Sequence, residues 1–269
     1  MLKDADRGAD DADALGARFK RNLPGLMMHA TNEATNYLGM IAGYAELLLQ
    51  PPDPSELPML IEWFGSITLL RAESLKESVQ AMRDAATWDA AAADAPAPEP
   101  FDLRAFLESE LEREWQAEVR RDELRRRFDE ADPTAAARPV VARTLAAAIP
   151  SDLPMVHGDA AKARQLLGLL VKLAVRGHQK GALRVVGRHD AEHVSIYWLV
   201  AGFPESLRHL YRHISAAGQE GEEFGAYVPF FESFALQYSC LLARLLGGRV
   251  ELDDLDPATQ RLRLTLPRV

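Results

Sequence analysis

The sequence of 269 residues contains a single cysteine, Cys240, which lies in an apolar stretch. One thiol cannot form an internal disulfide, and no second cysteine is present to complete a zinc knuckle. A disulfide-stapled secreted domain and a cysteine-based metal site are therefore excluded. A reducing cytoplasm is the expected compartment, and no metal site is expected.

The sequence also lacks any continuous apolar run of about 20 residues, the length that a membrane-spanning helix needs. The first 14 residues are rich in Asp and Ala and have no apolar segment of the kind found in a secretory signal peptide. We therefore expect neither a membrane span nor a cleaved signal.

Positive charge is in deficit. There are 31 Lys and Arg residues against 40 Asp and Glu, which gives a formal net charge of -9. This charge repels phosphate backbones and anionic membrane surfaces, so nucleic acid is not an expected partner. Apolar residues are plentiful, at 48% of the chain, and they suffice for one or two globular cores.

Two helices are expected in the first third of the chain, one over residues 19–50 and one from an N-cap at Ser55, with Pro58 in its first turn, to about residue 88. The Pro51-Pro52-Asp53-Pro54 segment separates them. A hairpin of two helices has too little to bury by itself, so we expect it to dimerise into a four-helix bundle. Apolar residues recur at steps of three and four on the first helix (Ala34, Tyr37, Leu38, Ile41, Ala45, Leu48) and also form a stripe on the second (Leu60, Ile67, Leu70, Leu75, Val79, Met82).

The chain divides into four parts by composition. Residues 1–17 are expected to form a flexible acidic tail, 18–90 a helical-hairpin dimerisation domain, 91–100 a Pro- and Ala-rich linker, and 101–269 a second domain. This domain is predicted to be α+β, with helices on one face of a mixed sheet.

Local patterns assign most elements of the second domain. Helices are predicted from Asp102 to about Val119, over residues 160–176 and over residues 230–246, and Gly247-Gly248 ends the last of them. Strands are predicted over 182–187, 194–200, 249–252 and 261–266. Residues 123–130 are compatible with a strand, although they are highly charged. Residues 133–148 have no clear pattern, and residues 203–229 have weak periodicity.

Three local signatures resemble histidine kinases, in which a dimerisation and phosphotransfer hairpin precedes an ATP-binding α/β sandwich of the GHKL class. The resemblance extends from about Phe19 to Pro267, and no single signature is decisive. The signatures are Leu38-Gly39-Met40-Ile41-Ala42-Gly43-Tyr44-Ala45-Glu46-Leu47-Leu48; Pro100-Phe101-Asp102-Leu103-Arg104 with Leu153-Pro154-Met155-Val156-His157-Gly158-Asp159 and Arg164-Gln165-Leu166-Leu167; and the segment Leu242 to Val250.

The hairpin departs from this family at the position that should be phosphorylated. Counting back from Gly43, the family's His-Glu-x-x-Thr/Asn motif falls on residues 32–36, and Asn32 occupies the position of the histidine. An amide nitrogen is not a nucleophile toward phosphorus, because its lone pair is delocalised into the carbonyl. His29 lies three residues earlier and is the alternative phosphoacceptor, although an isolated imidazole on a helix is more often structural.

The nucleotide site implied by the resemblance is altered in all three of its motifs. Lys172 stands where the family has the asparagine that holds Mg²⁺, and an ammonium group cannot ligate a cation. Side chains in the second glycine motif would fill the space where backbone amides approach phosphates. The other altered positions are Trp198 for the adenine-binding aspartate, Val200 for the first glycine of a motif that keeps only Gly202, and Ser233 and Ala235 for the two glycines of the second motif.

These departures predict a pseudo-histidine kinase that binds no ATP and needs no cofactor of its own. Two alternatives stay open: a domain that binds another nucleotide, and an ordinary α+β domain without kinase ancestry. Residues 209–227 replace the family's ATP lid. Five aromatic residues are expected to fill the former cleft, namely Trp198, Phe203, Phe230, Phe231 and Phe234.

Glu33 and Asn36 are the residues of the hairpin motif that retain chemistry. They are three positions apart, so both lie on one side of the helix about a turn apart. The pair resembles the device with which bifunctional kinases and chemotaxis phosphatases dephosphorylate a receiver domain. The resemblance implies that the amide orients a water and the acid engages the receiver's lysine, while the receiver itself supplies Mg²⁺. The first hypothesis is therefore a dimeric phosphatase of a response regulator, and an ordinary polar helix face is the simpler interpretation.

A second hypothesis involves no chemistry. In this case Tyr37, Met40 and Tyr44 form the apolar centre of a docking face, and the protein acts as a scaffold or sequestering partner in two-component signalling. Packing within the bundle would account for the same three residues. A third hypothesis is phosphotransfer through His29.

Overall fold

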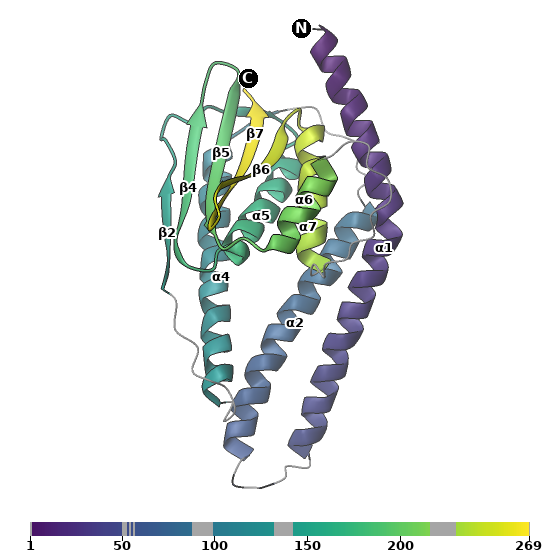
Figure 1. Ribbon diagram of the computed structural model, residues 1–269, viewed down its shortest axis with the longest axis vertical. Helices are drawn as coiled ribbons and strands as arrows, with labels where there is room; N and C mark the ends of the chain where they lie inside the picture. The colour runs from purple at the N-terminus through teal and green to yellow at the C-terminus, as the bar shows by residue number, and fades with distance from the viewer. Residues whose placement is uncertain are drawn as a thin grey trace.

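Two long helices, α1 (Leu2–Leu49) and α2 (Leu57–Thr87), form the predicted hairpin in the computed structural model (Figure 1). The structure describes residues 2–49, 53, 55, 57–87, 99–131, 142–215 and 230–268. Near the turn, the ring of Tyr44 stacks on Phe64 with centroids 4.7 Å apart, and Trp63 packs against both rings. This aromatic cluster joins the two helices at that end. No helix in the described part of the chain is long and apolar enough to cross a membrane.

The first helix begins at Leu2, so residues 2–17, which composition predicts to be a flexible tail, are helical in the structure. Phe19 is buried, and Leu15 and Leu23 pack partly buried against the same core. These residues are four apart, which places them on one side of a helix. Tertiary contacts thus extend the helix beyond the hairpin, and composition alone did not reveal them.

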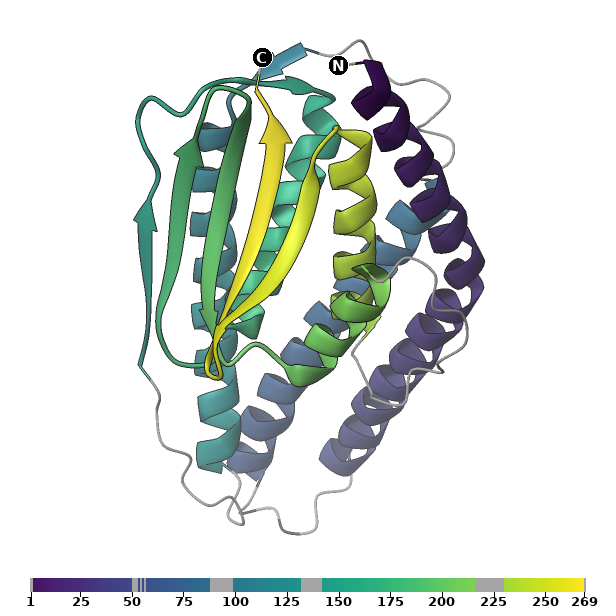
Figure 2. The same cartoon turned by 45° about the horizontal axis from the view of Figure 1, so that its top comes forward.

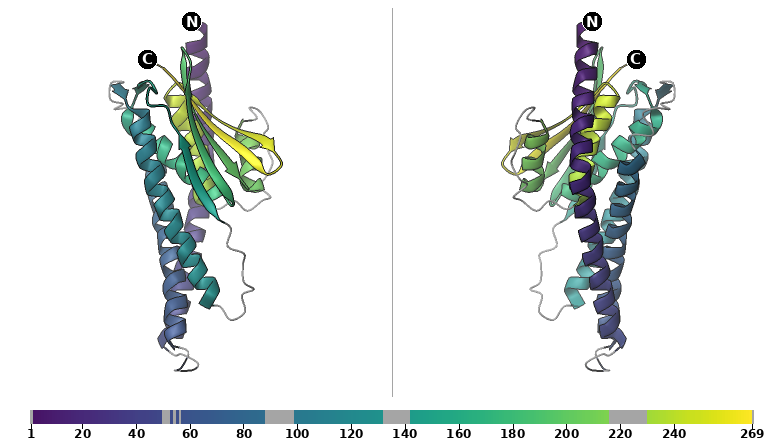
Figure 3. Two further views of the ribbon diagram at one scale, coloured as in Figure 1. Left: turned by 90° about the vertical axis from the view of Figure 1, so that its left-hand side faces the viewer. Right: turned by 90° about the vertical axis from the view of Figure 1, so that its right-hand side faces the viewer.

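The third long helix, α4 (Leu103–Ala131), is also longer than predicted, and residues 123–130 are helical rather than a strand. Its start is capped by Asp102, whose Oδ1 accepts the N–H of Ala105 at 3.0 Å. The charges that obscured the pattern are helix-spaced ion pairs, as in Arg125–Asp122 at 2.9 Å and Arg127–Glu123 at 2.8 Å. Figure 3 shows α4 alongside α2, and the two helices are in contact.

A five-stranded mixed sheet forms the outer layer of the second domain, as predicted (Figure 2). Strands β2 and β4 are parallel, and the other neighbouring strands are antiparallel. The order is β2 (Arg143–Ala148), β4 (Gly181–His189), β5 (His193–Ala201), β7 (Thr259–Pro267) and β6 (Arg249–Asp256).

A small second sheet pairs β1 (Glu99–Phe101) with β3 (Val156–Gly158) in antiparallel register. Glu99 and Pro100, which we predicted to belong to the linker, are therefore strand residues. Residues 91–98 of that linker lie outside the described residues, as do residues 132–141.

Helices α5 (Ala160–Gly177), α6 (Glu205–Ser215) and α7 (Phe230–Leu245) complete the domain. Every second residue of β5 from Val194 to Val200 is buried, which is the pattern of a strand with one covered face. The predicted segment with weak periodicity contains α6, and residues 216–229 lie outside the described residues. In Figure 1 the helix layer separates the sheet from the hairpin.

The hairpin and the second domain share one hydrophobic core. Phe19, Leu26 and Ala30 of α1 and Ala81 of α2 are buried in the same cluster as the residues of α5, α7 and the sheet. The α1 helix packs on α7, and α2 packs on α4. The domain is therefore held to the hairpin by direct packing, not by the linker alone.

The buried His178 joins three elements of this domain. Its Nδ1 accepts the N–H of Ala201 at 3.2 Å, and its Nε2 lies 3.0 Å from the carbonyl oxygen of Gly181. A ring nitrogen that accepts a backbone N–H must be unprotonated, so the neutral ring carries its proton on Nε2. Burial lowers the pKa of His178 below 6.5, and the charge of Arg143 adds to this effect.

We therefore expect the free energy of unfolding to fall as the pH drops through the ordinary histidine pKa of 6.5, because the unfolded chain binds the proton more readily than the folded one. The variant His178→Gln should be less stable by about 1–3 kcal/mol at pH 7.5, since it disturbs two buried hydrogen bonds. It should also lose less stability between pH 7.5 and 5.5. Urea unfolding at both pH values measures this, and equal pH dependence in the two proteins would contradict it.

Candidate functional site

The side chains of the predicted hairpin motif differ in their exposure to solvent. Asn32 and Asn36 are exposed, whereas Glu33 is only 5% exposed. Glu33 lies on the side of α1 that faces α7, and its Oε1 accepts the N–H of Phe230 at 3.0 Å. Phe230 is the first residue of α7, where a helix leaves N–H groups without partners and carries a partial positive charge. The structure thus places the carboxylate of the motif at the start of a helix 197 residues away in sequence.

His29 lies one turn before Glu33 and contacts the same group. Its Nε2 is 3.6 Å from Glu33 Oε1, and its side chain is 31% exposed. The edge of its ring meets Phe230, with centroids 6.3 Å apart at an interplanar angle of 80°. The alternative phosphoacceptor is therefore adjacent to a carboxylate and an aromatic ring.

The three predicted docking residues are half-buried, and two of them, Tyr37 and Tyr44, contact aromatic or cationic side chains of the chain itself. The guanidinium of Arg71 lies 5.2 Å from the ring centroid of Tyr37. Burial raises the pKa of Tyr37, and the charge of Glu33 acts in the same direction. Tyr44 belongs to the aromatic cluster of the hairpin, and Met40 is partly exposed. A partner-binding role for these residues stays a prediction.

The positions aligned with the first glycine motif lie at the end of β5. Trp198 and Val200 are completely buried on its inner face. Gly202 follows with φ +86°, a conformation that favours glycine, and a methyl group there would come within 3.0 Å of Gln179. The backbone conformation and the close approach of Gln179 therefore explain the glycine at position 202 without a bound nucleotide.

The positions aligned with the second glycine motif lie in the first turns of α7. Ser233 and Ala235 are buried, and Phe234 between them is completely buried. Its ring centroid is 6.2 Å from that of Phe19, while Phe19 stacks on Tyr238 at 5.5 Å. Helix α1 therefore covers the side of α7 that carries this motif. All five aromatic residues expected in the former cleft are buried, namely Trp198, Phe203, Phe230, Phe231 and Phe234.

Lys172 lines a cavity of about 300 Å³ between α2, α4, α5 and α7. Its ammonium group lies 3.8 Å from Glu114 Oε1 and 5.6 Å from the ring centroid of Phe231. Lys76 and Glu77 of α2 are among the other lining residues, so the hairpin forms one wall. In the part of the chain that the structure describes, no three His, Cys, Asp or Glu side chains gather as metal ligands.

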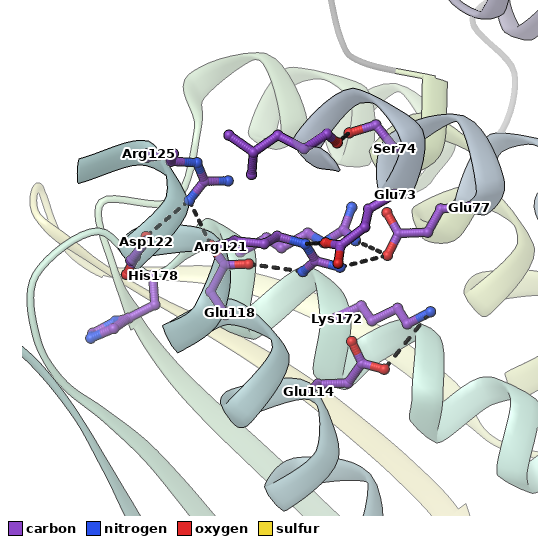
Figure 4. A network of polar contacts seen from close by, with 12 residues as sticks. Glu73, Ser74, Glu77, Glu114, Glu118, Arg121, Asp122, Arg125, Lys172 and His178 are labelled. Atoms are coloured by element: carbon purple, nitrogen blue, oxygen red, sulfur yellow. Dashed lines mark hydrogen bonds and ion pairs between the residues drawn. The ribbon is translucent and has the colours of Figure 1, made fainter. Parts of the chain in front are cut away.

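An ion-pair network joins the hairpin to the domain beside this cavity (Figure 4). Arg121 of α4 pairs with Glu73 at 3.3 Å and Glu77 at 2.8 Å, both on α2, and with Glu118 at 3.0 Å on its own helix. Glu77 also pairs with Arg176 of α5. The network thus connects three helices through largely buried charges.

Two carboxyl groups around the network have shifted pKa values of opposite sign. Burial favours protonation of Glu118, but Arg125 and Arg121 outweigh it and hold the pKa of this carboxyl below its usual value. Burial raises the pKa of Glu232 in the first turn of α7, and Glu33 and Glu77 add to the rise against the opposing charge of Arg176. Negative charge therefore gathers at the start of α7.

Sequence reasoning missed this network. Glu73 and Glu77 are four residues apart on α2, and Arg121 and Arg125 are four apart on α4, so each pair marks one charged helix side. That spacing is a signal for a charged face. Nothing in it indicates that the two faces meet, because only the packing of α2 on α4 brings them together.

Neither a model of a known protein family nor a curated protein sequence matches the chain. Solved structures do. The histidine kinase AdeS of Acinetobacter baumannii is 14% identical with a TM-score of 0.50, and the match covers 86% of this chain and 95% of that chain. The chain has the fold of a histidine-kinase core. This confirms the predicted fold class, in which a helical hairpin precedes an α/β domain.

Two further structures have lower TM-scores. A histidine kinase from Burkholderia phymatum STM815 is 17% identical with a TM-score of 0.41, and the match covers 89% of this chain and 98% of that one. A bacterial phosphotransferase is 14% identical with a TM-score of 0.43, and covers 90% of this chain and 95% of its own.

The first prediction from this site concerns Glu77. The change Glu77→Gln should lower the free energy of unfolding by about 3 kcal/mol, because it leaves two poorly solvated guanidinium groups, Arg121 and Arg176, short of a carboxylate. The matched control is Glu123→Gln, which breaks an ion pair whose side chains are about half exposed and should cost less than about 1 kcal/mol. Urea unfolding compares them, and equal losses would contradict a structural role for the network.

The second prediction concerns nucleotide. Because buried side chains occupy the aligned motif positions in β5 and α7, millimolar Mg-ATP should leave the melting temperature of the protein unchanged to within about 1 °C. Differential scanning fluorimetry with and without Mg-ATP measures this. A rise of several degrees would show that a nucleotide still binds.

Proposed function

We propose that this chain is a kinase-dead signalling protein that binds the receiver domain of a response regulator and hydrolyses its aspartyl phosphate. The observation that carries the proposal is the exposed Asn36 on the hairpin helix, three residues after Glu33, within a histidine-kinase fold. An exposed amide at this place can meet a partner without any rearrangement of its own helix.

The proposed hydrolysis requires only one catalytic contribution from this protein, the positioning of a water molecule. The Asn36 amide orients a water molecule in line with the phosphorus, the water oxygen forms the new bond, and the aspartate oxygen leaves as a carboxylate. Inorganic phosphate is released and keeps both protons of the water, as dihydrogen phosphate. The receiver supplies the Mg²⁺ and the lysine that balance the charge, so this chain needs no cofactor.

Two features support the absence of kinase activity. Asn32 has no nucleophilic lone pair for a phosphoryl group. Trp198 and Val200, at positions that would contact nucleotide in the family, lie inside the hydrophobic core. Any remaining activity would therefore remove a phosphoryl signal rather than create one.

We propose in addition that the protein is a homodimer through its hairpin. Large apolar side chains are exposed on both helices, and a four-helix bundle with a second copy would bury such residues. They include Met28, Leu38 and Leu47 on α1 and Ile61, Leu69 and Val79 on α2.

A second candidate function is binding without catalysis, and the burial of Glu33 favours it. In the present arrangement this carboxylate is bonded to α7 and is not available to a receiver. Phosphotransfer through His29 is less well supported, because a phosphoryl group on its Nε2 would be repelled by the Glu33 carboxylate 3.6 Å away.

The phosphatase proposal predicts faster decay of a phosphorylated receiver in the presence of this protein. Asn36→Ala should reduce the acceleration about 100-fold, the usual loss when one positioned polar group is removed from a transition state. Gln116→Ala, which removes an exposed amide from α4, is the control and should keep the full rate.

The receiver is first loaded with a small-molecule phosphoryl donor, and its decay is then followed by gel or by phosphate release. Identical decay with and without the protein would leave only the binding function. Radiolabel that moves onto this protein and disappears in His29→Ala would establish phosphotransfer instead.

A further inference from the structure

We propose that the ATPase-like domain is an autoinhibitory latch on the hairpin: α7 holds Glu33, and a receiver engages this carboxylate only after α1 and α7 have separated. This inference rests on the proposed function, since it describes how access to the same site is controlled. It assigns the lost nucleotide domain a role that needs no nucleotide.

The latch is centred on the bond between Glu33 and the start of α7. Glu33 Oε1 accepts the Phe230 N–H at 3.0 Å, and the residue is 5% exposed. A lysine of a partner must come within about 3 Å of this carboxylate to pair with it. The α7 helix occupies that approach, so the closed domain and a receiver lysine compete for the same group.

The contact continues along α1 toward its N-terminus. Leu26 is 8% exposed, and Ala30 has no exposed surface. Asn22 donates to Gln237 Oε1 at 3.4 Å, and Arg18 donates to the carbonyl of Ile214 at 3.2 Å. The interface therefore ends at the motif itself, with Glu33 inside it and Asn36, a turn further on, outside.

Like charges weaken the latch from within. Glu232 stands in the first turn of α7, at the same helix end that Glu33 occupies. Arg176 is 3.9 Å from Glu232 and offsets part of the repulsion. The pairs of Arg121 and Arg176 with Glu77 hold α2 to the domain. Loss of the α1 contact thus leaves the domain attached through α2, which acts as the pivot.

The change Ala30→Arg tests opening, because no space exists for a guanidinium between α1 and α7. The matched control is Ala17→Arg, the same substitution at an exposed position of the same helix. Hydrogen exchange of the peptide that contains Phe230 reports separation. We expect faster exchange and at least a five-fold faster receiver dephosphorylation in Ala30→Arg, and wild-type values for both in Ala17→Arg.

A tether tests closure and does not depend on the folding of Ala30→Arg. Cysteines replace Asn22 and Gln237, whose side chains meet across the interface, and a short bismaleimide joins them. The buried Cys240, whose pKa burial raises to about 12, is replaced by serine. Cross-linked protein should lose receiver dephosphorylation, and the same variant without the cross-linker should retain it.

The outcomes separate this proposal from the function on which it rests. If wild-type protein accelerates dephosphorylation while the cross-linked form is equally fast, or Ala30→Arg exchanges faster but is no more active, the latch is disproved and the phosphatase stands. If neither wild type nor Ala30→Arg accelerates the decay, the phosphatase function fails, and the latch falls with it.

Discussion

The burial of α7 on all its sides is the constraint on which the rest of the structure depends. From Phe230 to Ala243, every residue of this helix except Glu232 is buried. A helix that is apolar all round must be covered from every direction. The sheet, α2, α5 and α6 cover only part of it, and α1 covers much of the rest. This requirement accounts for the length of α1, which continues as a helix far beyond the hairpin, and for the single core shared by the hairpin and the domain.

The same constraint bears on the nucleotide site that the resemblance to histidine kinases implies. A site that receives phosphates on a helix N-terminus must leave that end open, with backbone N–H groups facing a ligand. Here the first N–H of α7 meets a carboxylate of the same chain, and the phenylalanines around it pack against α1. The Glu33 carboxylate occupies the helix end where a phosphate group would otherwise bind. The charge requirement of the helix end is met without a ligand.

Much of this fold could be predicted from local patterns. The helix α5 and the strands β4, β5, β6 and β7 have the periodicity of elements with one covered face, and the long apolar run of α7 is typical of a buried helix, so local sequence suffices to predict them. Elements whose form depends on distant neighbours were predicted less well. Residues 2–17 are helical, and Phe19, just after them, packs on Tyr238. The charged end of α4 is stabilised by ion pairs between side chains, which do not appear in the pattern of apolar residues.

The candidate site shows the same division. The exposure of Asn36 and the burial of Trp198 follow from simple rules of helix and strand patterning. The burial of Glu33 does not, because it depends on a partner 197 residues further along the chain. A glutamate in an amphipathic helix is normally placed in solvent. Only tertiary structure reveals that this side of α1 has a second helix on it.

The contact between α1 and α7 also has a consequence for folding during synthesis. It joins residues that are 197 positions apart in the sequence, and such distant contacts form late. During synthesis, the apolar side chains of Phe19 and Leu26 must wait for a helix that begins at Phe230. Until then they are open to other apolar surfaces, those of chaperones and of sister chains on the same messenger among them. The order of synthesis thus leaves these side chains exposed until α7 has been made.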